Sequence, residues 1–421
     1  MRASGGGPGK AIPRRQCSGF IIQIMTRVLY AAFDIVPSPK GASTHILHNL
    51  RGLVDGHFDV HLITPNDGLL PTEDTMDGAH VTRIPQDLTQ SYLERAIHFG
   101  RSVMAHMALS EVAGALNYDV VHYRSVWGGL QLAQNKMRFG YKTIFEVNGL
   151  PSVELKYHYP AIEPELLMKI REQELATLHL SDAIICPSHV TRDYLTSLGV
   201  DRGRVTVIPN GVSPSDFPAS PLPKRVGRLP VLLYIGTLAD WQGLEVVIRS
   251  LPHILEKQPV QLRIVGRGRS RQRKLLAKQI RKLGVDEHVL VQPAVPHHEV
   301  PALIAGSDIC IAPLGLNDRN VTQGACPIKV LEYMASGRPL LASNMPIVRE
   351  LVREDVDALL FSPNDPLDLA RQVLALLNDV ELSERLADSA AERVLTKFTW
   401  HESQKKLLKV YEKLLQAAPQ V

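Results

Sequence analysis

The chain has 421 residues, of which 45% are hydrophobic and 21% are charged, a composition typical of a folded globular protein rather than a disordered one. Its formal net charge is +4, but residues 1–24 hold four basic residues and no acidic one. The remainder is therefore balanced, so overall charge does not indicate a polyanion-binding protein, and the length favours two domains.

The glycine-rich, basic opening of residues 1–24 is predicted to be a flexible tail, with Met25 as an alternative start. The cysteines are scattered without metal-type pairing, which favours a reducing, cytoplasmic setting. They are Cys17, Cys186, Cys310 and Cys326. No apolar run is long enough to span a membrane, although peripheral contact with the inner face of one stays open.

In residues 25–210, short apolar runs alternate with helical patterns, which predicts a parallel sheet covered on both faces. Strands are expected at residues 28–33, 58–63, 119–122, 143–147, 183–186 and 205–208. Helices are expected up to residue 54 and over residues 91–116. Gly41 precedes the first helix, where the backbone turns sharply or approaches a ligand closely.

Polar residues follow two of these strands. His122 ends one, and Glu146 and Asn148 end another. Ligands of open parallel sheets bind at the carboxyl ends of the strands. Each residue alone could be an ordinary loop residue, but together they make this edge a candidate binding site.

Residues 211–229 are rich in proline and poor in apolar residues, which indicates a linker. The alternation restarts over residues 230–398, with strands expected at 231–235, 261–265, 289–292 and 308–312. Helices are expected at 244–255, up to 283 and near 298–305, and a final helix at 401–415 lies within a last segment of residues 399–421. Two doubly wound units predict two Rossmann-like domains facing one another across a cleft.

Residues 313–339 carry the most informative pattern. A polar loop leads into a helix expected to start at Pro327 and to end before Gly337. A helix N-terminus at the end of a strand is a ready anion site. Lys329 falls in the first turn, where the helix dipole disfavours a cation, and Glu332 follows one turn later. The pair indicates a bound anion, or alternatively a simple surface ion pair.

Two other patterns are weaker evidence for a binding site. Gly266-Arg267-Gly268 resembles the start of a dinucleotide fingerprint, but Arg271 stands where the third glycine belongs. Between Arg263 and Lys282 there are nine basic residues and no acidic one, which indicates a solvated helix face or a surface for an anionic partner. No aromatic residues are interleaved, so nucleic acid is not favoured.

Taken together and in order, several motifs resemble glycosyltransferase family 4, whose members are retaining enzymes of GT-B fold with nucleotide-sugar donors. The resemblance runs from about Arg27 to the C-terminus. Its carriers are Ser38-Pro-Lys-Gly-Ala, Phe145-Glu-Val-Asn-Gly-Leu-Pro, Val207-Ile-Pro-Asn-Gly-Val, Tyr234-Ile-Gly-Thr-Leu, Arg263-Ile-Val-Gly-Arg-Gly, Ile311-Ala-Pro and, above all, Lys329-Val-Leu-Glu-Tyr-Met-Ala-Ser-Gly-Arg-Pro.

The resemblance implies roles for particular residues. Glu332 would bind the donor ribose, Gly41 would let the diphosphate approach, and Val295 would lie near the base. The loop of Gly324, Cys326, Pro327 and Ile328 would touch the transferred sugar. Gly236, Thr237, Gln242, Gly266 and Arg267 would complete the substrate site, and the last helix would cross back to the N-terminal domain.

The chain also departs from the family pattern. Thr237 and Gln242 stand where an arginine and a lysine commonly neutralise the diphosphate, and Gly324 replaces an acidic residue. Asn148 replaces a histidine, and an amide is a poor base. We therefore expect Lys329 to carry the phosphate role, with Arg319 or Arg267 as further cations.

The implied reaction moves a sugar from a UDP- or GDP-sugar to a hydroxyl of a glycan, lipid-linked or small-molecule acceptor. The diphosphate leaves and the acceptor attacks on the same face, with no metal or other cofactor. Asn148 and His122 would orient the sugar or the acceptor. The alternatives are a scaffold that binds nucleotide-sugars without catalysis, and another sugar-nucleotide enzyme of this fold, such as an epimerase.

Overall fold

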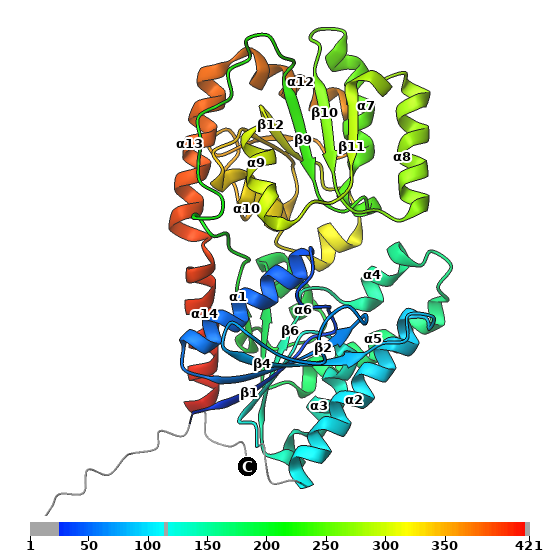
Figure 1. The fold of residues 1–421 in the computed structure, drawn as a ribbon, viewed down its shortest axis with the longest axis vertical. Coiled ribbons are helices and arrows are strands. Elements are labelled where there is room, and N and C mark those ends of the chain that lie inside the picture. The colour runs from blue at the N-terminus through cyan, green and yellow to red at the C-terminus, as the bar shows by residue number, and fades with distance from the viewer. Residues whose placement is uncertain (1–24, 113–116, 417–421) are drawn as a thin grey trace, which may run out of the picture.

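The computed structural model describes residues 25–112 and 117–416. The predicted tail of residues 1–24, with Cys17, lies outside the described residues, as do residues 113–116 and 417–421. Two separate sheets form the chain's two halves, one above the other in Figure 1. This confirms the predicted α/β architecture of two Rossmann-like domains.

The N-terminal sheet has the strand order β3-β4-β2-β1-β5-β6-β7-β8 and is parallel except for the β3–β4 hairpin. Its strands are β1 (Arg27–Ala31), β2 (Asp59–Asn66), β3 (Glu73–Met76), β4 (Ala79–Pro85), β5 (Val120–Tyr123), β6 (Lys142–Glu146), β7 (Ala183–Cys186) and β8 (Val205–Val207). Its helices are α1 (Gly41–Asp55), α2 (Tyr92–Val112), α3 (Val126–Phe139), α4 (Pro151–His158), α5 (Pro164–Leu180) and α6 (His189–Ser197).

The C-terminal sheet is parallel throughout, with the order β11-β10-β9-β12-β13-β14. Its strands are β9 (Val231–Ile235), β10 (Gln261–Val265), β11 (Val289–Gln292), β12 (Ile309–Ala312), β13 (Leu340–Ser343) and β14 (Leu359–Phe361). Its helices are α7 (Leu244–Leu255), α8 (Ser270–Leu283), α9 (Val300–Ala305), α10 (Ile328–Ala335), α11 (Pro346–Arg349), α12 (Pro366–Asn378) and α13 (Val380–Lys397).

Each sheet is buried on both faces by helices, as expected for parallel strands. In the C-terminal half, Leu233 and Cys310 pack with α10 and α13 on one face, and Leu232 and Ile309 pack with α7 and α12 on the other. The N-terminal sheet is covered in the same way on its two faces. The residues just beyond β5 and β6, Arg124 and Asn148, and those just beyond β9 and β10, Gly236 and Gly266, line cavities between the halves, so both sheets present the carboxyl ends of their strands to the cleft.

The chain crosses between the halves twice, and the two crossings lie side by side. Val212 N donates to the Phe398 carbonyl at 2.9 Å, and Trp400 N donates to the Val212 carbonyl at 3.3 Å. A Cβ atom on Gly211 would lie 2.3 Å from Trp400 N, so only glycine fits this approach.

The last helix, α14 (Trp400–Gln416), runs down from the upper half along the lower one (Figure 1). It buries Leu407, Val410 and Leu414 in the same apolar cluster as Leu50 and Leu53 of α1. The expected return of the C-terminal helix to the N-terminal domain is therefore observed. Residues 417–421 of the predicted segment are not described.

The packing of α14 predicts a stability difference between two of its leucines. Leu407 is fully buried, and removing its side chain should lower the free energy of unfolding by about 2–4 kcal/mol through lost burial and a cavity. Leu415 is 39% exposed, so Leu415→Ala should cost less than about 0.5 kcal/mol. Urea unfolding of Leu407→Ala and Leu415→Ala measures the two losses in the free energy of unfolding. Equal losses would contradict the observed packing of α14.

Candidate functional site

Helix α10 begins at Ile328, with Pro327 as its N-cap residue, one position later than expected. It ends at Ala335, and Gly337 follows with a left-handed φ of +64°. The first turn of α10 faces the cleft, where Ile328 lies against Gly41 of the N-terminal half. The residues on this turn therefore meet the N-terminal half.

A cavity of about 380 Å³ lies between the N-terminus of α1 and that of α10, and we call it the Glu332 cavity. Its lining residues from the N-terminal half are Pro39, Lys40, Gly41 and Thr44. Those from the C-terminal half are Ile235, Gly236, Thr237, Gln242, Val265, Gly266, Arg267, Ala294, Val295, His297, Val300, Ile328, Lys329 and Glu332. Most residues of the predicted substrate site thus come together at one place.

Lys329 lies deep in this cavity. Its Nζ donates a hydrogen bond to Gln242 Oε1 at 2.7 Å and lies 4.2 Å from the centre of the Tyr234 ring. Desolvation lowers the pKa of Lys329 to about 7, although the nearby Glu332 opposes the shift. An anion in the cavity would stabilise the charged form of this lysine and raise its pKa.

Glu332, one turn further along α10, also faces the cavity. Its Oε1 lies 3.1 Å from His297 Nε2, and the hydrogen bond raises the pKa of His297 above its ordinary value. The Glu332 carboxyl is otherwise free among the residues that the structure describes, and its side chain is 11% exposed. It can accept hydrogen bonds from the hydroxyls of a ligand.

Three glycines keep the walls of the Glu332 cavity close together. A Cβ atom on Gly236 would lie 2.5 Å from Lys329 Nζ, and one on Gly266 would lie 1.7 Å from the Gly236 carbonyl oxygen. A Cβ atom on Gly41 would lie 3.3 Å from Ile328 Cδ1, across the cleft. Larger residues would fill the space next to the α10 N-terminus.

Two more cations line the Glu332 cavity. Lys40 and Arg267 are exposed side chains, and within the described part of the chain neither lies within ion-pair distance of a carboxylate, although Asp34 is close enough to Lys40 to feel its charge. Together with Lys329 they outnumber the single carboxyl of Glu332. The cavity therefore has the charge balance expected of a site for a polyanion.

A second cavity, of about 370 Å³, adjoins the first because Gly41 and Ile328 line both. We call it the Asn148 cavity. Its other lining residues are Phe33, Asp34, Ala42, His45, Tyr92, Arg124, Ser125, Asn148, Gly149, Pro151, Glu154, Pro187, Asn210, Arg319, Ala325 and Cys326. Most of them belong to the N-terminal half.

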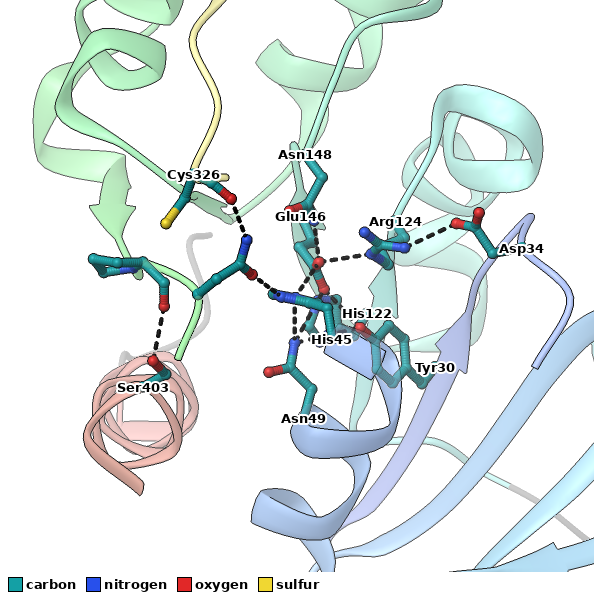
Figure 2. A network of polar contacts seen from close by, with 12 residues as sticks. Tyr30, Asp34, His45, Asn49, His122, Arg124, Glu146, Asn148, Cys326 and Ser403 are labelled. Atoms are coloured by element: carbon teal, nitrogen blue, oxygen red, sulfur yellow. Dashed lines mark hydrogen bonds and ion pairs between the residues drawn. The ribbon is translucent and has the colours of Figure 1, made fainter. Parts of the chain in front are cut away.

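The buried carboxylate of Glu146 lies at the centre of a network of polar contacts (Figure 2), and three of its partners, His45, Arg124 and Asn148, line the Asn148 cavity. It receives hydrogen bonds from the Tyr30 hydroxyl at 2.6 Å, Arg124 Nε at 2.8 Å and the Asn148 amide. Burial alone would raise the pKa of Glu146, but His45 and Arg124 hold it well below its ordinary value. Since its oxygens are occupied, Glu146 acts as an anchor rather than as a base.

His45 connects this cluster to the C-terminal half. Its Nε2 lies 2.7 Å from Glu146 Oε1 and its Nδ1 lies 2.6 Å from Asn210 Oδ1. The Asn210 amide donates to the Cys326 carbonyl at 2.6 Å, next to α10 (Figure 2). A chain of hydrogen bonds therefore runs from Glu146 across the cleft to the loop that precedes α10.

The position of His122 corrects one expectation. Its side chain is fully buried beneath the cluster, stacked on Tyr30, with Nδ1 2.8 Å from the Tyr411 hydroxyl of α14. Burial lowers its pKa. His122 lines neither cavity because its side chain points to the face of β5 that α14 covers, so it supports the cluster instead of contacting a sugar or an acceptor.

The loop before α10 closes against the N-terminal half. Arg319, in the π-helix Arg319–Gln323, donates to Glu154 Oε1 at 2.9 Å and so lines the Asn148 cavity rather than the Glu332 cavity. Gly324 has φ +83° and packs against Thr191, where a Cβ atom would come within 2.7 Å. Of the loop residues expected to touch a sugar, Cys326 and Ile328 line a cavity, whereas Gly324 and Pro327 do not.

Several residues of the site carried no decisive signal in the sequence. They are Asp34, His45, Glu154 and His297, together with Asn210, which lies in a motif that carried the resemblance but was given no role. Asp34 comes directly after the predicted first strand, residues 28–33, and the rule that ligands bind beyond strand ends could have pointed to it. The others meet only through contacts between distant segments.

Over residues 25–112 and 117–416, no group of three or more His, Cys, Asp or Glu side chains is arranged to hold a metal ion. In the same ranges, no helix combines the length and the apolar character needed to cross a bilayer.

Comparison with known proteins agrees with this architecture. Residues 39–216 match the model described as Glycosyltransferase Family 4, and residues 223–393 match the model described as Glycosyl transferases group 1. An uncharacterized glycosyltransferase of Methanocaldococcus jannaschii is 23% identical over 88% of this chain and 94% of its own. A D-inositol 3-phosphate glycosyltransferase of Xylanimonas cellulosilytica is 26% identical over 72% of this chain and 73% of its own.

Solved structures share the fold. A sucrose-phosphate synthase of Thermosynechococcus elongatus superposes with a TM-score of 0.76 at 19% identity, over 93% of this chain and all of its own. HepE of Anabaena in complex with UDP gives 0.71 at 17% identity, over 92% and 100% of the two chains. With both halves matched and the expected fold in place, the chain belongs to glycosyltransferase family 4 and has the GT-B fold.

Proposed function

We propose that the chain is a retaining, metal-independent glycosyltransferase that transfers a sugar from a UDP- or GDP-sugar to a hydroxyl acceptor. One observation carries the proposal: Lys329 and Glu332, one turn apart on α10, line the same cavity in the cleft. A cation with free helix N–H groups suits a diphosphate, and a carboxyl suits the two hydroxyls of a ribose. HepE, which shares the fold, has been solved with UDP.

In this proposal the diphosphate lies between Gly41 and the α10 N-terminus. Lys329, Arg267 and Lys40 stabilise the charge that develops as the sugar leaves. Thr237 and Gln242 line the same cavity but carry no charge, so these three cations replace the Arg and Lys that the family commonly has there. Val295 and its neighbour Ala294 provide an apolar wall for the base.

The acceptor occupies the adjoining Asn148 cavity, and its hydroxyl attacks on the face that the diphosphate leaves. Asn148 positions the sugar or acceptor but does not remove a proton, because its amide donates to Glu146 and cannot be protonated near neutral pH. Glu146 is saturated with donors. The departing phosphate therefore takes the acceptor proton.

Replacing Glu332 tests the donor site. In Glu332→Gln, charge-assisted hydrogen bonds to the ribose are weakened, and we expect UDP or GDP to bind about tenfold to a hundredfold less tightly. Glu299→Gln is the matched control, because Glu299 is a nearby exposed carboxyl that does not line the cavity. Calorimetric titration and sugar-transfer assays give the readouts, and unchanged affinity in Glu332→Gln would contradict the assignment.

The pKa of Lys329 predicts a pH dependence. Free Lys329, with a pKa of about 7, is mostly neutral at pH 8, whereas a bound diphosphate raises this pKa and favours the charged form. Binding of UDP should therefore take up as much as one proton near pH 8, and affinity should fall by up to about tenfold per pH unit above pH 7. Below pH 7 the lysine is already charged, so this dependence disappears.

Titration calorimetry in buffers of different ionisation enthalpy measures the proton uptake. Lys329→Met should bind UDP more weakly and lose the uptake. Two results would contradict the phosphate role of Lys329. One is that the unaltered protein binds UDP at pH 8 without taking up a proton, and the other is that Lys329→Met leaves turnover and UDP affinity unchanged.

Metal independence is tested by chelation. Sugar transfer by protein treated with EDTA and assayed without divalent ions should equal transfer in the presence of Mg²⁺ or Mn²⁺, because Lys329, Arg267 and Lys40 supply the positive charge. Activity that is lost on chelation and restored by one of these ions would show that a metal is needed.

A further inference from the structure

The basic side chains that line the Asn148 cavity are already paired with carboxylates. Arg124 contacts Asp34 at 2.8 Å and Glu146 at 2.8 Å, and Arg319 contacts Glu154 at 2.9 Å. His45 faces Glu146 at 2.7 Å. The cavity therefore offers no surplus of positive charge.

The polar atoms left over in this cavity are mainly hydrogen-bond acceptors. Asp34 uses Oδ2 for Arg124, while its Oδ1 has no partner among the described residues, and its side chain is 32% exposed. Asn148 donates its amide to Glu146, which leaves its Oδ1 unused. Glu154 uses Oε1 for Arg319 and Gln323, and its Oε2 is likewise unpaired in the described ranges. Carboxylate and amide oxygens accept hydrogen bonds from hydroxyls.

The neighbouring Glu332 cavity shows the opposite arrangement in the same protein. There Lys40, Arg267 and Lys329 have no carboxylate within ion-pair distance in the described part of the chain. A phosphate group entering the Asn148 cavity would instead meet Asp34 and Glu154, whose like charge opposes it. The two cavities are thus suited to different ligands, one anionic and one neutral.

We propose that the acceptor is an uncharged polyhydroxylated unit, a sugar or cyclitol without a phosphate on the unit that enters the Asn148 cavity, and that Asp34 is a specificity-determining residue for it. Asp34 Oδ1 accepts hydrogen bonds from acceptor hydroxyls, and the Asn148 and Glu154 oxygens accept others. The Tyr92 hydroxyl, which accepts from Trp127 Nε1 at 3.1 Å, keeps its proton to donate. This inference rests on the proposed function.

The first experiment compares neutral and phosphorylated ligands on the full chain loaded with UDP. The probes are methyl hexosides and myo-inositol, each beside its monophosphate, with binding measured by ligand-observed NMR and calorimetry. Neutral probes should bind at least about tenfold more tightly than their phosphates. A phosphate that binds as tightly as its neutral partner, or a full set of neutral probes that fails to bind, would overturn the proposal.

The second experiment uses Asp34→Asn, which keeps the size of the side chain but removes its charge. The neutral probe that binds most tightly should lose about tenfold in affinity, and the preference over its phosphate should shrink, a change that a purely structural role would not produce. Asp182→Asn is the matched control, since Asp182 forms a part-buried pair with Lys136 at 2.7 Å away from both cavities. The role of Asp34 would be overturned if Asp34→Asn bound the neutral probe as tightly as the unaltered protein does and preferred it over its phosphate to the same extent.

Binding of UDP separates this inference from the proposed function. Asp34 does not line the Glu332 cavity, and removing its negative charge near Lys40 would not weaken the binding of an anion, so Asp34→Asn should bind UDP at least as tightly as the unaltered protein does. If the unaltered chain bound neither UDP nor GDP, the proposed function would fail. If UDP bound and the phosphorylated probes were preferred, only the choice of acceptor would fail.

Discussion

The structure depends on one electrostatic constraint: Lys329 is held in a desolvated cleft on the first turn of a helix whose own N–H groups are also positive. Its amine donates a hydrogen bond to the uncharged side chain of Gln242 and lies over the face of the Tyr234 ring. Neither the lysine nor the helix N-terminus has an anionic partner at ion-pair distance among the described residues. An anion between them would interact favourably with both. Gly41, Gly236 and Gly266 have no side chains to fill the cavity, so they leave room for that anion.

The second half of the cleft is arranged around a negative charge instead. Glu146 lies beneath the Asn148 cavity, and a buried carboxylate is tolerated only when it is fully paired. His45, Arg124 and Asn148 provide that pairing, and through Asn210 the same cluster reaches the Cys326 carbonyl of the other half. Hydrogen bonds therefore connect the Glu146 cluster directly to the loop that precedes α10.

Sequence reasoning located α10, Lys329 and Glu332 because their signals are local: a strand end, a glycine-rich loop, a capped helix and a recognisable motif. It placed most of the parallel strands for the same reason, but missed the β3–β4 hairpin although its turn, Asp77-Gly78, is a known hairpin signal. The pairing of His45 with Asn210 could not be predicted, since 165 residues separate them. His122 lies on the same face of β5 as Val120, and the residues near it in the sequence could not show that α14 covers this face.

The central claim is that a nucleotide diphosphate binds at the amino end of α10 with its ribose on Glu332. The most direct test is a crystal structure of the chain with a UDP- or GDP-sugar bound. The account predicts phosphate oxygens within hydrogen-bond distance of Lys329 Nζ and the first N–H groups of α10, and both ribose hydroxyls on the Glu332 carboxyl. A nucleotide bound elsewhere, with Glu332 still paired only to His297, would contradict it.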